Sequence, residues 1–392
     1  MVGIDKINFY TPNTYIKLEE LANYRGVDPD KFTIGIGQSK MSVPPISQDT
    51  VSMAANAAYP LLTKNDLNNI DLIVVGTETG VDESKSVASF IHQLLDIHPF
   101  AKSVDLKQAC YGATAGLMMA VDFVRLHPDK KALVIGSDIS RYGLNSSGEV
   151  TQGAGAIAMI ISSSPSILEI EEVSVSMTKS IFDFWRPNYS KTAIVDGKFS
   201  NEAYISFFSE LWHEYKNRTA RSFEDFSAFC FHLPYTKMGK KALMPLLDAE
   251  APNNKDLLLE HYQLSTTYSR DIGNIYTGSL YLSLMSLLES TLSSLKENQR
   301  IGFFSYGSGA VAEIFSGKLV PGFKDALLTK QHDTLLNDRI SLSIDSYTDM
   351  FNDELAIDSE GNHLFKQDKT DNGVFFFKGV ENHQRLYGKN KE

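Results

Sequence analysis

The sequence has little cysteine and lacks any long apolar run. Its two cysteines, Cys110 and Cys230, are too few for a disulfide framework, which is typical of a protein that works in a reducing compartment. No basic and apolar signal pattern begins the chain, and no uncharged apolar run approaches the roughly 18 residues of a membrane span. We therefore expect a soluble, cytoplasmic protein that does not enter a membrane.

Basic residues are also scarce relative to acidic ones. The formal net charge of -11 argues against a nucleic-acid binder, because phosphate contacts require a basic surface. Neither a His-Glu-x-x-His nor a Cys-x-x-Cys spacing occurs, so no metal site is expected, and the Gly-x-Ser-x-Gly elbow of serine hydrolases is absent. With 43% hydrophobic and 22% charged residues, the composition is that of an ordinary globular protein, long enough at 392 residues for two fused halves.

A lone cysteine lies where a predicted strand gives way to a predicted helix. Residues 103–106 form a short extended run, and apolar residues at helical spacing follow between residues 113 and 124. Cys110 is therefore expected near a helix N-terminus, where free amides and the helix dipole favour a thiolate over a thiol of pKa about 8.5. This makes Cys110 a candidate nucleophile; the alternative is a buried, unreactive side chain.

A carboxylate follows a second predicted strand. Residues 71–76 form a continuous apolar run, which is typical of a central strand covered on both faces. Glu78 comes directly after it, at the carboxyl end of the strand, where catalytic groups gather in open α/β sheets. Glu78 is thus a candidate general base, and the alternative is a solvated loop carboxylate.

The second half of the sequence repeats the order of the first. The apolar run 227–231 ends at His232, as the first ends near Glu78, and a loop entering an apolar helix places Asn274 where the first half has Cys110. The glycine-containing segments 153–161 and 307–315 match nearly position for position. Three pairs of similar segments in the same order predict that the second half is a duplicate of the first.

The predicted halves are residues 1–165, with Glu78 and Cys110, and residues 166–392, with His232 and Asn274. Within the second half, residues 180–224 are rich in aromatic side chains. We interpret this stretch as an insertion that covers the cleft, with packed core as the alternative.

If the two halves pack about a pseudo-twofold axis, four of these side chains meet in one cleft. They supply a thiol for covalent catalysis, a carboxylate to take a proton, an imidazole and an amide donor, and they are Cys110, Glu78, His232 and Asn274. Beside the imidazole lies a basic cluster in an otherwise acidic chain. Lys237 and Lys241 are four residues apart, on one helical face, and could neutralise the phosphates of a nucleotide carrier; the alternative is a solvated helix surface.

Five segments together resemble the hydroxymethylglutaryl-CoA synthase family, of the bacterial type, within the thiolase superfamily. The resemblance covers essentially the whole chain in length and motif order. The segments are 107–114 (KQACYGAT), 76–79 (GTET), 232–237 (HLPYTK), 273–279 (GNIYTGS) and 304–309 (FSYGSG).

This resemblance implies a thiolase-like, five-layered α/β/α/β/α fold of two pseudo-twofold-related halves, usually a homodimer, and an acyltransferase of the mevalonate pathway. Cys110 would be acetylated by acetyl-CoA, and Glu78 would remove a proton from the acetyl methyl group. The enolate would add to acetoacetyl-CoA while His232 polarises or protonates the ketone oxygen. Water would then release 3-hydroxy-3-methylglutaryl-CoA.

The resemblance also implies roles for the remaining residues. Asn274 would hold the acyl carbonyl, and the backbone N–H groups of Ser308 and Cys110 would form the oxyanion site. Tyr142 is expected to contact the substrate, while Lys237 and Lys241 suit the CoA phosphates. No metal or redox cofactor is implied, because the CoA thioesters are substrates.

Two alternatives remain at this point. A ketoacyl-ACP synthase or a thiolase would share Cys110 and the fold, but neither needs a carboxylate at the position of Glu78. A non-catalytic CoA-binding protein would keep the lysines without requiring the carboxylate, thiol and imidazole together.

Overall fold

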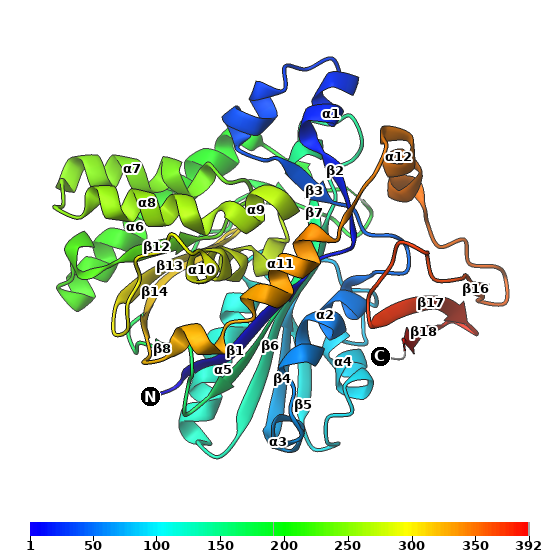
Figure 1. The fold of residues 1–392 in the computed structure, drawn as a ribbon, viewed down its shortest axis with the longest axis horizontal. Coiled ribbons are helices and arrows are strands. Elements are labelled where there is room, and N and C mark those ends of the chain that lie inside the picture. The colour runs from blue at the N-terminus through cyan, green and yellow to red at the C-terminus, as the bar shows by residue number, and fades with distance from the viewer. Residues whose placement is uncertain (191, 391–392) are drawn as a thin grey trace.

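The structure is a computed structural model that describes residues 1–190 and 192–390 (Figure 1). Five strands of the first half lie in the order β1-β7-β6-β4-β5. β5, β4 and β6 are parallel, while β7 runs antiparallel to both β6 and β1. Their bounds are β1 (Gly3–Tyr10), β4 (Ile70–Gly76), β5 (Lys102–Leu106), β6 (Lys131–Ser140) and β7 (Gly153–Ser162).

The second half builds the same arrangement. β12 is parallel to β13, which pairs antiparallel with β14, which in turn pairs antiparallel with β9, as β4, β6, β7 and β1 do. β8 pairs with both β1 and β14 and so joins the halves into one ten-stranded sheet. The bounds are β8 (Leu168–Ile170), β9 (Val175–Thr178), β12 (Ala228–Phe231), β13 (Arg300–Gly307) and β14 (Val311–Leu319).

The helices divide the protein into five layers. α5 (Gly112–Leu126) and α10 (Ser279–Glu289) lie in the middle, because their apolar side chains share one core with strands of both halves. α2 (Thr50–Ala58) and α4 (Val87–Leu94) cover the outer face of the first half, and α6 (Gly197–Thr219) and α7 (Met238–Glu250) cover that of the second. Figure 1 shows α7 and α4 on opposite sides of the molecule. The predicted thiolase-like architecture is confirmed.

Two equivalent residues meet between the central helices. Thr114 is the third residue of α5 and Tyr281 the third residue of α10, and their hydroxyl groups lie 2.9 Å apart. Three residues before each helix stands a residue with positive φ, Ala109 at 43° and Tyr276 at 44°. The position equivalent to Cys110 is therefore Thr277.

The prediction that Asn274 takes the place of Cys110 is wrong by three residues. A short helical turn, Tyr276–Gly278, stands between Asn274 and the first residue of α10. Helical periodicity in the sequence does not separate such a turn from the helix that follows it.

The aromatic stretch between residues 180 and 224 contains the long helix α6. Its large side chains pack against strands of the second half and are largely core, among them Tyr204, Phe207, Phe208, Trp212 and Tyr215. α6 covers the second half as α2 covers the first. Before α6, a small hairpin is formed by β10 (Phe184–Trp185) and β11 (Ile194–Val195).

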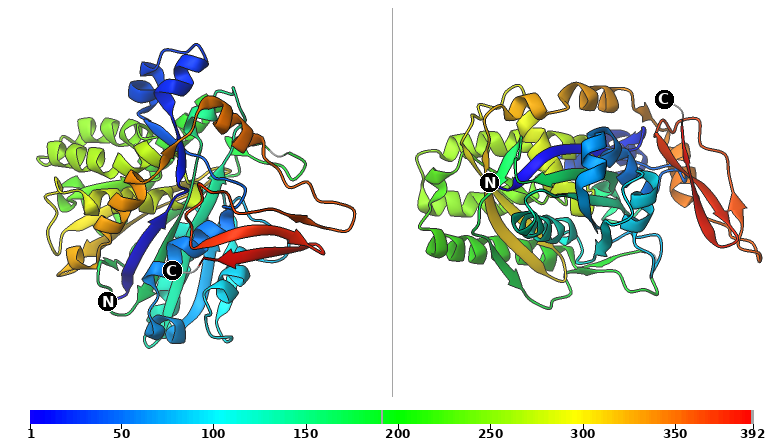
Figure 2. Two further views of the ribbon diagram at one scale, coloured as in Figure 1. Left: turned by 45° about the vertical axis from the view of Figure 1, so that its right-hand side comes forward. Right: turned by 90° about the horizontal axis from the view of Figure 1, so that it is seen from below.

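The remaining elements lie around this body. The C-terminal hairpin β17–β18 projects from it (Figure 2). No helix in the described part of the chain is both long and apolar enough to cross a membrane. The bounds are β2 (Thr14–Lys17), α1 (Leu18–Tyr24), β3 (Lys40–Ser42), α3 (Lys64–Asn69), α8 (Lys255–Ser265), α9 (Thr267–Ile272), α11 (Thr329–Asn337), β15 (Ile340–Ser341), α12 (Ile344–Asn352), β16 (His363–Leu364), β17 (Phe375–Glu381) and β18 (Gln384–Lys389).

Candidate active site

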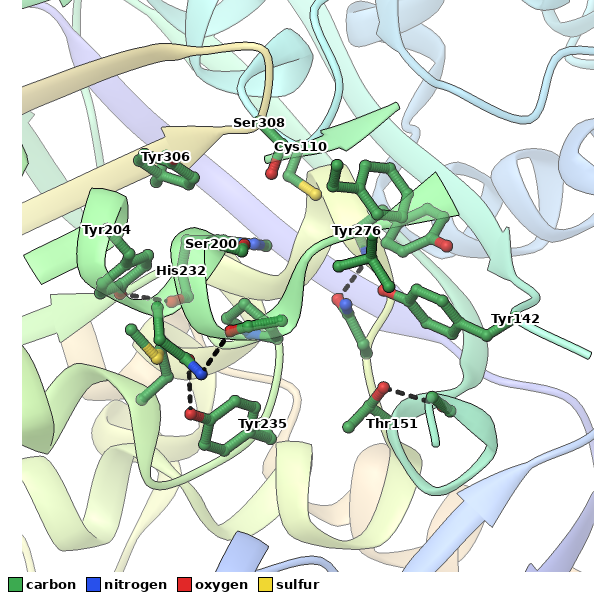
Figure 3. Close-up of a pocket in the computed structure, with 18 of the residues that line it drawn as sticks. Cys110, Tyr142, Thr151, Ser200, Tyr204, His232, Tyr235, Tyr276, Tyr306 and Ser308 are labelled. Carbon is green, nitrogen blue, oxygen red and sulfur yellow. Dashed lines mark hydrogen bonds between the residues drawn. The ribbon is translucent and has the colours of Figure 1, made fainter. Parts of the chain in front are cut away.

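A cavity of about 190 Å³ opens between the two halves (Figure 3). Glu78 is not among its lining residues but touches Cys110, while Lys237 and Lys241 lie on the neighbouring α7 segment. Five of the residues singled out from the sequence line it: Cys110, Tyr142, His232, Asn274 and Ser308.

The nucleophile candidate is a buried thiol. Cys110 Sγ donates a hydrogen bond to Glu78 Oε1 at 3.2 Å. Burial, followed by the negative charge of Glu78, raises the pKa of Cys110 well above that of a free thiol. The expected thiolate is therefore wrong for the resting site, since these two effects outweigh the helix dipole. The thiol needs a base, and Glu78 is in contact with it.

The turn that carries Cys110 is clamped by the second half of the chain. The Gln108 side-chain amide donates to the Ser308 carbonyl at 3.2 Å, and the Tyr111 hydroxyl donates to Glu313 Oε2 at 2.7 Å. Figure 3 shows Ser308 directly beside Cys110. These bonds fix the thiol at the boundary between the halves.

Glu78 has the electrostatic character of a base that works near neutral pH. Burial, then repulsion from Asp138, raises the pKa of Glu78 to about 8, while the Cys110 hydrogen bond and Arg186 act in the opposite direction. The Glu78 amide donates to Asp138 Oδ1 at 2.9 Å, and the Arg186 guanidinium donates to the Glu78 carbonyl. Its backbone is therefore held from two sides.

Asp138, which no sequence motif marks, connects the two halves behind the site. Its Oδ1 accepts bonds from the Thr77 and Thr79 hydroxyls at 2.9 and 2.7 Å, and its Oδ2 accepts from the Thr277 amide at 3.1 Å. The available signal was a carboxylate at the end of the buried run 132–136. Such a residue needs partners from elsewhere in the chain.

His232 directly follows β12 and lines the cavity. Its amide donates to the Phe304 carbonyl at 2.9 Å, and its carbonyl accepts from the Tyr204 hydroxyl at 2.7 Å. Burial lowers the pKa of His232 to about 3, so the imidazole is neutral at physiological pH. Nδ1 has no hydrogen-bond partner among the described residues. Nδ1 is itself buried, so Nε2 is the ring nitrogen that is left to bond a substrate oxygen in the cavity.

Asn274 and Tyr142 lie together on another wall of the cavity. Asn274 Oδ1 accepts from the Tyr276 amide and the Ser279 hydroxyl, each at 2.9 Å, which fixes the orientation of the amide group. The Tyr142 hydroxyl interacts with the side chains of Asn274 and Tyr276. These bonds orient an amide donor within the cavity.

The two lysines lie beside the cavity. Lys237 immediately precedes α7, and Lys241 lies one turn further, with both side chains exposed. Lys241 Nζ donates to the Tyr235 hydroxyl at 2.9 Å, and this hydroxyl donates to Asn201 Oδ1 at 2.8 Å. Tyr235 and Asn201 both line the cavity. The ammonium group of Lys241 is thus connected to the cavity wall through the Tyr235 hydroxyl.

Known proteins are similar to this one in fold and sequence over almost the whole chain. Residues 1–166 match the family model described as hydroxymethylglutaryl-coenzyme A synthase N terminal, and residues 168–260 and 253–390 match the corresponding C-terminal model. The hydroxymethylglutaryl-CoA synthase of Enterococcus faecalis is 53% identical, over 91% of this chain and 93% of its own length.

Solved structures agree with these matches. A crystal structure of an HMG-CoA synthase complexed with CoA superimposes with a TM-score of 0.96 at 44% identity, over 99% of this chain and 100% of that one. MvaS in complex with 3-hydroxy-3-methylglutaryl coenzyme A superimposes with a TM-score of 0.87 at 33% identity, over 100% and 99% of the two chains.

Proposed function

Because this chain belongs to the hydroxymethylglutaryl-CoA synthase family, we propose that it makes 3-hydroxy-3-methylglutaryl-CoA through an acetyl thioester on Cys110. The enzyme condenses acetyl-CoA with acetoacetyl-CoA and water, as the reaction of this family requires, and it serves the mevalonate pathway. The observation that carries the proposed mechanism is the contact of the Cys110 thiol with Glu78 in a cavity that also holds His232.

The first step acetylates the enzyme. Ionised Glu78 accepts the thiol proton as the Cys110 sulfur attacks the carbonyl carbon of acetyl-CoA. The oxyanion faces the backbone N–H groups of Cys110 and Ser308. The carbon–sulfur bond to CoA then breaks, and the leaving thiolate takes the proton from Glu78. The carboxylate is thereby ionised again for the next step.

The second step forms the carbon–carbon bond. Glu78 removes a proton from the methyl group of acetyl-Cys110, and Asn274 stabilises the enolate oxygen through its amide. The enolate carbon adds to the ketone carbon of acetoacetyl-CoA. Neutral His232 hydrogen-bonds the ketone oxygen, and the proton that Glu78 removed from the methyl group passes to this oxygen, which becomes the hydroxyl of the product and leaves Glu78 ionised again.

Hydrolysis completes the cycle. Water attacks the thioester that links the product to Cys110, which frees 3-hydroxy-3-methylglutaryl-CoA and restores the thiol. Tyr142 contacts the acyl groups, and Lys237 with Lys241 binds the CoA phosphates outside the cavity. No metal or redox cofactor takes part, because CoA thioesters are the substrates and every step moves only protons and acyl carbon.

Mass spectrometry tests this assignment. Incubation with acetyl-CoA adds one acetyl group at Cys110, and Cys110→Ser remains unlabelled. Glu78→Ala still acquires the acetyl group, more slowly, but forms no product with acetoacetyl-CoA. Unimpaired condensation by Glu78→Ala would remove Glu78 from the mechanism. Product formation from malonyl thioesters with loss of CO₂ would favour a ketoacyl-ACP synthase instead.

The same proposal includes a homodimer. β5 is the last strand on its side of the sheet, and Phe100, Val104 and Met119 are exposed on or near it. Unpaired strand edges with apolar side chains tend to pair with another chain, and a second copy would extend the sheet across a twofold axis. Sedimentation should give twice the 43.6 kDa chain mass, and Val104→Lys should give the monomer. A monomeric wild-type protein would exclude this interface.

We also propose a cytoplasmic location. Cys110 must remain a thiol to react, and both cysteines are free. A reducing compartment maintains that state. Fractionation of the producing cells, followed by immunodetection, tests this assignment, and recovery outside the cytoplasm would contradict it.

A further inference from the structure

Three aromatic rings enclose Cys110. The ring centroids of Tyr142 and Phe184 are 5.9 Å apart, those of Tyr142 and Tyr276 6.3 Å, and those of Phe184 and Tyr276 6.0 Å. All three pairs meet edge to face, with interplanar angles of 68°, 86° and 66°. They form a separate apolar cluster with the cysteine. The space next to the sulfur is therefore bounded by aromatic walls.

The two tyrosine walls are fixed by their own contacts. Tyr276 is 1% exposed and lies at the left-handed residue of its turn. The Tyr142 amide donates to Gln152 Oε1 at 2.7 Å, and the backbone of Gly148 lies so close to the Tyr142 ring that an added Cβ would stand 2.7 Å from it. Tyr276 is therefore buried in place, and Gly148 blocks the Tyr142 ring on one side.

Phe184 is fixed from both sides along the chain. Next to it, Asp183 accepts bonds from the Tyr306 hydroxyl at 2.7 Å and the Gly309 amide at 2.8 Å. Two residues further, Arg186 donates to the Glu78 carbonyl. Phe184 itself pairs with Val195 in the β10–β11 hairpin and is 8% exposed. The backbone on both sides of Phe184 is thus anchored, and one of the anchors, Arg186, also holds the proposed base.

We propose that Phe184 is a specificity-determining residue, which limits the acyl group that Cys110 accepts from the donor CoA thioester to two carbons. This inference rests on the proposed acetyl thioester. Phe184 is the wall without a polar atom, so shortening it opens space without removing a hydrogen-bonding group. A close-packed site resists one added methylene, and such a difference changes selectivity by about 10- to 200-fold.

The test compares acylation of Cys110 by acetyl-CoA and by propionyl-CoA, followed over time by mass spectrometry of the intact protein. Wild type should acetylate at least about 10-fold faster than it propionylates. In Phe184→Leu, the ratio of the two rates should fall at least about 10-fold, because the methylene gains space beside the sulfur.

Phe182→Leu is the matched control. It makes the same change two residues away, at a ring that is 67% exposed, packs on Trp185 and does not line the cavity. Its rate ratio should equal that of wild type. Phe184→Met, closer in volume to phenylalanine, provides a second variant if Phe184→Leu does not fold, and it should shift the ratio in the same direction.

Three outcomes separate the two proposals. A lower ratio in the Phe184 variants alone supports the inference. An unchanged ratio in folded Phe184 variants, with normal acetylation of Cys110 in wild type, overturns it and leaves the proposed function intact. Absence of any acetyl group on wild-type Cys110 overturns the proposed function, and with it the inference.

Discussion

Asp138 Oδ2 and Thr277 Oγ1 lie 2.5 Å apart although they belong to different halves of the chain. The other oxygen of the same carboxylate accepts the amide of Glu78. Asp138 therefore fixes the position of the base and, through its charge, raises the pKa of Glu78. This double role makes the pH dependence of the reaction a sensitive test of the geometry.

Condensation should depend on the ionisation of Glu78. Because the pKa of Glu78 is raised to about 8 and the base must be ionised, kcat/KM should increase with pH and level off above about 8. His232, with its pKa lowered to about 3, stays neutral over this range and adds no second transition. In Asp138→Asn the loss of the repelling charge should move the increase to lower pH. Initial rates between pH 6 and pH 10 measure both profiles.

Thr277→Val is the control for that shift, since it removes the hydroxyl bond to Asp138 but keeps the carboxylate. It should lower the rate while leaving the midpoint near that of wild type. An Asp138→Asn profile with an unchanged midpoint would show that Asp138 does not control the base.

Replacing Lys237 and Lys241 together should weaken CoA binding. The double variant of Lys237→Gln and Lys241→Gln should raise KM for acetyl-CoA about fivefold, as expected for exposed charges, with little change in kcat. An acetyl thioester of pantetheine, which lacks the nucleotide phosphates, should not be affected. Lys330→Gln, on exposed α11, is the matched control. Equal KM effects on both thioesters would contradict the assignment to phosphates.

A buried ion cluster should govern acid stability. Asp66 accepts bonds from Lys6 at 2.6 Å and Lys131 at 2.7 Å, and its side chain is 1% exposed. These bonds hold its pKa below the usual value despite burial. The stabilisation is therefore present above the unfolded pKa of about 3.9 and is lost as pH falls toward the lower folded value.

Asp66→Asn should lower the free energy of unfolding at pH 7 by about 3 kcal/mol, because two partly buried lysines lose their carboxylate. Its further loss of stability below pH 4 should be smaller than that of wild type. Urea titrations at pH 7 and below pH 4 measure the difference. Asp248→Asn, at an exposed pair with Lys255, should change stability by less than about 1 kcal/mol. Equal effects of the two substitutions would contradict this prediction.

Backbone strain at Ala109, next to the nucleophile, should lower the free energy of unfolding of the wild-type protein. Ala109 has a φ of 43°, a region that costs an L-residue about 1 kcal/mol and glycine little. Ala109→Gly should therefore raise the free energy of unfolding. The gain should be at most about 1 kcal/mol, because glycine also gives the unfolded chain more conformational freedom, which offsets part of it. Ala115→Gly, inside α5, should instead lower it by about 1 kcal/mol. Urea titrations that show the same loss in both variants would exclude strain at Ala109.

The strands and two central side chains were predictable from sequence because their signals are local. Continuous apolar runs mark β4 and β12, which the structure confirms. Cys110 and Glu78 each follow a strand within a few residues, so their presence near a strand end could be read directly. The sequence also predicts that they share one cleft, but not their direct contact, because this contact depends on the pairing of β4 with β5.

Asp138 and Phe184 could not be found in this way. The donors to Asp138 come from residues near positions 77 and 277, which only the packed halves bring together. Phe184 lies in a stretch with many aromatic residues, where Phe182 is exposed and Phe184 buried. Sequence offers no periodic pattern that separates them, since tertiary packing alone decides which ring faces the sulfur.

The equivalence of Cys110 and Thr277 has a consequence for the origin of the site. Two identical halves in an ancestral dimer would have carried the same residue at both places. In this chain the two positions differ: one holds a reactive thiol, and the other a hydroxyl within hydrogen-bond distance of Asp138 and of the Gly76 carbonyl. Two equivalent positions of a nearly symmetric fold therefore have different roles: Cys110 takes part in the reaction, and Thr277 holds Asp138 in place.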